Sequence, residues 1–142
     1  MIETGDQLSG MPPYWYVAFY DGERPHWWWP LCRPGFRHVA AFGYCAGQAA
    51  WLLYDVTTRR TLIRMLTPSQ MDAWVADLPD HRRIVAFEPV GEPAEPALRA
   101  GFWCTPAVAH LVGARSRALR PEAFYRDLLA QGARPAFESR QA

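Results

Sequence analysis

Hydrophobic and polar residues alternate over several short segments of this chain, and the alternation predicts strands. Five segments show this repeat or are rich in aromatic and β-branched residues, and turn residues such as Asp21-Gly22 bound them. The expected strands cover residues 14–20, 36–43, 50–56, 61–66 and 83–90.

Helices are predicted by their start signals. Thr67-Pro68 and Thr105-Pro106 both combine a capping residue with a proline suited to the first helical position. Gly132 supplies a stop signal for a last helix. The expected helices cover residues 69–77, 106–114 and 121–131. We therefore expect an α+β fold, with an antiparallel sheet of about five strands packed against about three helices.

Composition favours a single folded domain over residues 1–142, with an N-terminal arm at 1–12 and a C-terminal tail at 133–142. Half of the residues are hydrophobic and 14% are aromatic, which supports a buried core. The formal net charge of +1 gives no reason to expect a nucleic-acid partner. No apolar run is long enough to cross a bilayer, and the first residues lack the pattern of a Sec signal peptide.

The chain has three cysteines without CxxC spacing, so neither a disulfide framework nor a zinc site is expected. We expect no metal and no cofactor. Free thiols are typical of a reducing compartment. The chain contains neither Lys nor Asn, whose codons are A-rich, and this composition favours a GC-rich bacterial or bacteriophage genome.

Cys104 is the first candidate for chemistry, because it stands directly before a predicted helix in GFWCTPAVAH. The positive end of a helix dipole favours the thiolate form of a cysteine. Cys104 is therefore a candidate nucleophile, and its backbone N–H is a candidate oxyanion donor. The alternative is an ordinary buried cysteine at a junction between a loop and a helix.

His38 and Asp55 are the second candidate feature. If the hairpin between the second and third strands closes on Ala46-Gly47, His38 falls directly opposite Asp55. A carboxylate could then hold one imidazole nitrogen and leave the other free for a nucleophile. Two alternatives remain: His38 is a structural histidine paired with Asp55, or Asp55 caps the turn at Thr57-Thr58.

The order of these residues resembles circularly permuted papain-like proteins of the NlpC/P60 superfamily. The segments RPGFRHVAAF, WLLYDVTTRRTLIRML, GFWCTPAVAHLVGAR and LRPEAFYRDLL also resemble small proteins of tailed phages, prophages and gene-transfer-agent loci. The resemblance implies a permuted papain-like fold with Cys104 as nucleophile, His38 as base and Asp55 as orienting residue. One departure is the Thr105-Pro106 pair directly after the thiol, where a smoother apolar helix start is expected.

The resemblance implies a phage-associated cysteine hydrolase of amide or peptide bonds, with peptidoglycan as the expected substrate. The alternative is a non-catalytic tail or head-tail protein that keeps the fold. Both place the chain in a virion or the bacterial cytoplasm, with other virion or tail proteins as partners. Aromatic residues dominate interface hot spots, so four tryptophans are candidate substrate or partner contacts. They are Trp27, Trp28, Trp29 and Trp103.

Overall fold

The structure is a computed structural model that describes residues 12–22, 27–57, 59–89 and 103–137. Most of the expected N-terminal arm and the last five residues of the expected tail lie outside the described residues. The elements are β1 (Trp15–Tyr20), η1 (Trp29–Leu31), β2 (His38–Cys45), η2 (Ala46–Gln48), β3 (Ala50–Val56), β4 (Thr61–Leu66), α1 (Pro68–Ala76), β5 (Arg83–Phe87), α2 (Cys104–Val112), α3 (Pro121–Ala130) and β6 (Arg134–Ala136).

The strands form one antiparallel sheet in the order β4-β3-β2-β1-β5-β6, so the α+β prediction is confirmed. Six strands are present in the described residues, one more than expected. The additional strand, β6, pairs Ala136 with Ile84 at the edge of the sheet. This strand has three residues, one of them a proline, and is too short to show an alternating pattern, so no local signal predicts it.

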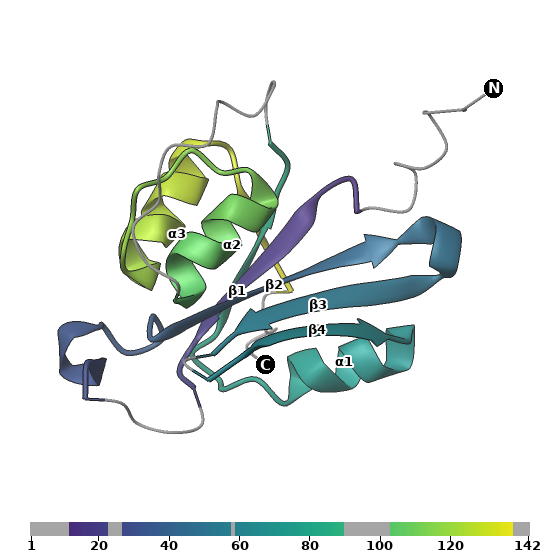
Figure 1. The fold of residues 1–142 in the computed structure, drawn as a ribbon, viewed down its shortest axis with the longest axis horizontal. Helices are drawn as coiled ribbons and strands as arrows, with labels where there is room; N and C mark the ends of the chain where they lie inside the picture. Colours follow the sequence, from purple (N-terminus) through teal and green to yellow (C-terminus); the bar gives the residue numbers. More distant parts are fainter. Residues whose placement is uncertain (1–11, 23–26, 58, 90–102, 138–142) are drawn as a thin grey trace.

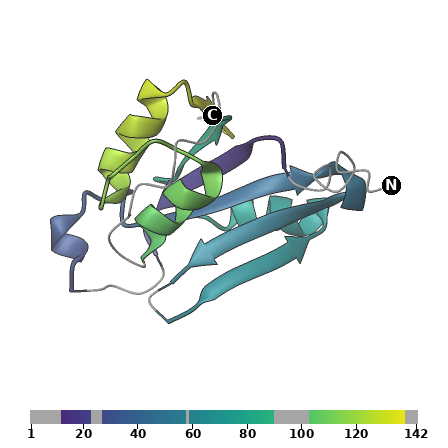
Figure 2. The same ribbon diagram turned by 45° about the horizontal axis from the view of Figure 1, so that its top comes forward.

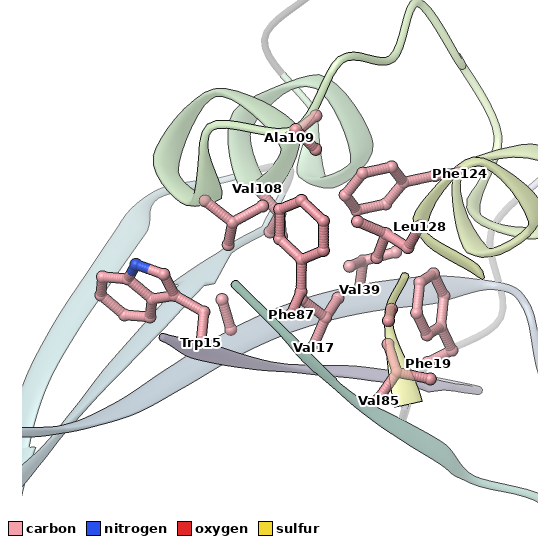
Figure 3. Close-up of a cluster of buried hydrophobic side chains, with 14 of the residues drawn as sticks. Trp15, Val17, Phe19, Val39, Val85, Phe87, Val108, Ala109, Phe124 and Leu128 are labelled. Carbon is pink, nitrogen blue, oxygen red and sulfur yellow. The ribbon is translucent and has the colours of Figure 1, made fainter. Parts of the chain in front are cut away.

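Helices cover both faces of the sheet: α2 and α3 lie on one face and α1 lies on the other (Figures 1 and 2). Under α2 and α3, buried side chains from three strands meet Val108 of α2 and Phe124 and Leu128 of α3 (Figure 3). A second cluster joins Met71 of α1 to Phe42 and other buried strand residues.

The central strand β2 supplies both clusters because successive side chains point to opposite faces. Val39 and Ala41 belong to the α2–α3 cluster, whereas Ala40 and Phe42 belong to the α1 cluster. His38, the first residue of β2, has the parity of Ala40. The fold therefore places His38 at one end of a strand that is buried on both faces.

The hairpin between β2 and β3 has a different register from the one predicted. Ala40 pairs with Asp55, so His38 is diagonal to Asp55 and not directly opposite it. The connection is longer than a two-residue turn, because η2 is followed by Ala49 with φ of 50° in the left-handed region. The shift is two residues, and His38 and Asp55 therefore remain on the same face.

The helices α1 and α2 begin differently from one another. In α1, Thr67 caps the helix and forms a capping box with Gln70, as the Thr-Pro signal predicts. In α2, the predicted start is wrong: the helix begins at Cys104, and Thr105 and Pro106 are its second and third residues. Proline is tolerated there because the first four N–H groups of a helix have no intrahelical acceptor.

Candidate active site

His38 and Asp55 form the best-defined polar contact of the site. The His38 Nε2 atom lies 2.6 Å from Asp55 Oδ1, and the two side chains are 17% and 19% exposed. Diagonal neighbours on one face of an antiparallel pair are within reach of long side chains, which explains why the contact survives the register shift. The edge of the Tyr20 ring packs against the imidazole, with ring centroids 5.2 Å apart. The imidazole is thus held by a carboxylate and an aromatic ring.

The thiol of Cys104 reaches the same imidazole and shares a hydrogen bond with it. Because Asp55 occupies Nε2, the nitrogen left for the sulfur is Nδ1. Cys104 begins α2, which packs over the opposite face of the sheet from α1 (Figure 2). His38 is the first residue of β2 and therefore lies at the end of the sheet. At this end the imidazole can meet the Cys104 thiol, although α2 covers the opposite face.

The surroundings of His38 favour its protonated form. Burial by itself lowers the pKa of this imidazole, since a buried charge loses hydration. Hydrogen bonds to Asp55 and Cys104, with the negative charges of both groups, outweigh burial and raise the pKa of His38 from 6.5 to about 10. His38 is therefore an imidazolium over the neutral pH range.

The surroundings of Cys104 favour its thiolate. Burial by itself raises the pKa of this thiol, but the hydrogen bond and charge of His38 outweigh burial and lower the pKa below its ordinary value of 9.0. Two further contacts act in the same direction: the Val39 backbone N–H donates to the sulfur, and the Thr105 hydroxyl lies 4.0 Å from it. These contacts shift the ionisation of Cys104 toward the thiolate, as those of His38 shift its ionisation toward the imidazolium.

The N-terminus of α2 adds donors beside the sulfur. Trp103 occupies the N-cap position and makes no side-chain capping hydrogen bond. The backbone N–H groups of the first helical residues, Cys104 and Thr105, have no intrahelical acceptor. Groups of this kind can donate to an oxyanion that develops next to the thiol.

The four tryptophans predicted to form contacts are placed differently. Trp103 adjoins the thiol, is 40% exposed and donates from Nε1 to the Leu119 carbonyl at 2.8 Å. Trp29 lies under the Arg37 guanidinium, 4.7 Å from ring centroid to carbon. Trp27 is 83% exposed and packs edge-on against Trp28. Trp103 is thus the member of this group that is adjacent to Cys104 in the chain.

The structure also brings in groups that the sequence reasoning missed. The sequence predicts Thr105 as a cap, but its side chain is fully buried and its hydroxyl lies 4.0 Å from the sulfur. The Val39 N–H, next to His38 in the sequence, donates to the same sulfur. Cys32, at the end of η1, lies close enough for the charge of Cys104 to raise its pKa, after the larger effect of burial. Thr105 follows Cys104 and Val39 follows His38 in the sequence, and this adjacency is the signal that could have identified both groups.

Comparisons with protein-family models, curated proteins and solved structures find no match to this chain. Within the described residues, no group of three or more His, Cys, Asp or Glu side chains could hold a metal ion. No helix in the described part of the chain is both long and apolar enough to cross a membrane. The interpretation of the site therefore depends on its own geometry.

Proposed function

We propose that this protein is a cysteine hydrolase of amide or peptide bonds, with Cys104 as nucleophile. One observation carries the proposal: His38 contacts Asp55 with one side of its ring and the Cys104 thiol with the other. A nucleophile, a base and a group that orients the base form the constellation of a nucleophilic triad. The lowered pKa of the thiol and the helix start beside it support the same role.

The reaction follows from these positions. The Cys104 thiolate attacks the carbonyl carbon, and the C=O electron pair moves onto oxygen, where the free N–H groups of the helix start can donate. The His38 imidazolium gives its proton to the departing amine as the C–N bond breaks, which leaves a thioester. Neutral His38 then takes a proton from water as the water attacks the thioester. The acid is released, and the thiolate and imidazolium are restored.

We further propose that the fold is a permuted papain-like arrangement, with the histidine and the acidic strand before the cysteine helix. The resemblance to small phage and prophage proteins makes peptidoglycan stem peptides the first substrates to test. A virion location and tail-protein partners belong to the same proposal. If an amine replaces water in the second step, the same residues perform acyl transfer.

A non-catalytic assembly role is the second candidate, and exposed apolar side chains favour it. Trp27 is 83% exposed, Leu31 is 62% exposed and Leu119 is 51% exposed. Large exposed apolar groups are typical of protein interfaces. An assembly protein would need no thiolate, so the ionisation of Cys104 separates the two candidates.

The test is the rate at which iodoacetamide alkylates Cys104 between pH 5 and pH 10, followed by mass analysis of the Cys104 peptide. In the native protein we expect fast alkylation at pH 6. In His38→Ala, the rate at pH 6 should fall about a hundredfold, since an unassisted thiol is almost fully protonated at this pH. Purified peptidoglycan and model amides can then be screened, and Cys104→Ala should abolish any hydrolysis.

His110→Ala is the matched control, because His110 is an exposed histidine on the same helix. It should leave the alkylation profile unchanged. Circular dichroism would verify that His38→Ala is folded, and His38→Gln offers a more conservative variant. A thiol that reacts only after unfolding, with no dependence on His38, would overturn the enzyme proposal and favour the assembly role.

A further inference from the structure

Three segments that are distant in sequence meet beside the Cys104 thiol. Trp103 donates from Nε1 to the Leu119 carbonyl, which brings the start of α2 next to the residues before α3. The following residue, Arg120, donates from Nη1 to the Leu31 carbonyl at 3.3 Å and so joins η1 to the same region. Arg120 is exposed, and Leu31 and Leu119 are largely exposed beside it.

Arg120 brings a positive charge to this region. Within the described residues no acidic side chain forms an ion pair with Arg120. The nearest acidic residue in the sequence, Glu122, binds Arg33 at 3.3 Å and Arg126 at 2.8 Å instead. A guanidinium has five N–H donors, so the bond to the Leu31 carbonyl leaves most of them for a ligand.

The charge of Arg120 reaches the thiol of Cys32. Burial raises the pKa of Cys32, and the positive charge of Arg120 acts against this effect. The negative charge of Cys104 also raises the pKa of Cys32, so both Arg120 and the nucleophile are within electrostatic reach of Cys32. Arg37 acts on Cys32 in the same sense as Arg120, but it also faces Asp21 at 3.7 Å. Arg120 is therefore the cation better placed to receive an anionic ligand.

We propose that Arg120 forms a carboxylate-binding subsite next to Cys104, so that the preferred substrates are amides with a free carboxylate close to the scissile bond. This inference rests on the proposed function, because it assumes that Cys104 is the nucleophile. The guanidinium offers paired N–H donors in the geometry that a carboxylate accepts. Trp103, Leu31 and Leu119 give the apolar part of such a substrate a surface to contact.

Two alkylating agents test the subsite directly. Iodoacetate and iodoacetamide are similar in size, and both alkylate a thiolate by forming an S–C bond as iodide leaves. Iodoacetate carries a carboxylate, whereas iodoacetamide is neutral. The ratio of their rate constants at the Cys104 peptide, divided by the ratio for a small free thiol, therefore measures recognition of the carboxylate.

We expect this normalised ratio to be about five- to tenfold above one at low salt, as an attraction between partly screened charges several ångströms apart predicts. In Arg120→Gln it should return close to one, and in Arg120→Lys it should stay raised. Arg126→Gln is the matched control, since it removes the same charge from the exposed surface of α3 and should leave the ratio unchanged. Raising the salt concentration should lower the wild-type ratio.

The outcomes separate this inference from the function on which it rests. Fast alkylation by both agents with a normalised ratio of one, or a raised ratio that persists in Arg120→Gln, would overturn the subsite and leave the thiolate–imidazolium pair intact. A native thiol that reacts with neither agent would overturn the proposed function and the subsite together. A raised ratio that needs a positive charge at residue 120 would support both.

Discussion

The helices α1 and α2 carry the same Thr-Pro pair at their starts, and the protein uses it in two ways. At α1 the Thr67 hydroxyl accepts from the Gln70 N–H at 3.2 Å, and the Gln70 side chain accepts from the Thr67 N–H at 2.9 Å. At α2 the pair lies inside the helix, the cap residue Trp103 makes no side-chain hydrogen bond that caps the helix, and a cysteine occupies the first helical position.

The two helix starts differ in whether their backbone N–H donors are satisfied by a side-chain cap. The start of α1 satisfies its own donors and lies at the surface. The start of α2 lacks a side-chain cap and holds a thiol paired with His38. Donors that a cap would satisfy are thus available to a substrate, while the buried residues Val108, Ala109 and Val112 hold α2 on the sheet.

The largest difference between the two helix starts should appear in the pH dependence of stability, because the start of α2 is charged. Folding raises the pKa of His38 from 6.5 to about 10, so its contribution is fully present below pH 6.5 and is lost as pH rises toward 10. Folding lowers the pKa of Cys104 from 9.0, so its contribution is present above pH 9 and is lost as pH falls. Where both slopes act, up to pH 9, they have opposite signs and oppose each other.

Urea unfolding of the wild type and Cys104→Ser across pH 5 to 10.5 would measure this effect. The difference in free energy of unfolding should fall as pH rises from 9 toward 10, where the part of the His38 contribution that depends on Cys104 is lost, and should fall at low pH, where the folded thiolate is protonated. The limiting slope is about 1.4 kcal/mol per pH unit for one proton. The difference in free energy of unfolding between the wild type and Thr67→Ala should not depend on pH in this way. A flat difference at all pH values would mean that no ion pair forms.

A second prediction concerns Thr105, whose hydroxyl faces the sulfur. Thr105→Val removes that hydroxyl, so the pKa of Cys104 should rise and alkylation at pH 6 should slow by about three- to tenfold. Thr105→Ser keeps the hydroxyl and should retain the wild-type midpoint. If Thr105→Val leaves the pH profile unchanged, Thr105 is a packing residue and does not tune the thiol.

The smallest expected effect is at Thr67. Thr67→Ala removes the cap of α1 and should lower the free energy of unfolding by about 1 kcal/mol, measured by urea denaturation. The alkylation rate of Cys104 should not change, because α1 lies on the opposite face of the sheet from α2 (Figure 1). A change in that rate would show that the two helix starts are coupled and would contradict the comparison.

Local signals predicted much of the fold. The bounds of β3 and β4 agree with their hydrophobic patterns, and the capping box of α1 agrees with its Thr-Pro signal. The hairpin register was wrong by two residues because the left-handed residue at Ala49 lengthens the turn, and no glycine marks that position. The candidate contact was nevertheless found, because a shift of two keeps the side-chain face.

The sequence by itself determined the periodicities, the helix-start signals and the parity that places His38 and Asp55 on one face, because these depend on neighbours along the chain. Only the tertiary structure decided that Cys104 meets the free side of His38 and that Arg120 lies beside Leu31. These contacts depend on how α2 and α3 pack against the end of the sheet. Such packing is set by the joint burial of side chains from several elements, and no single segment encodes it.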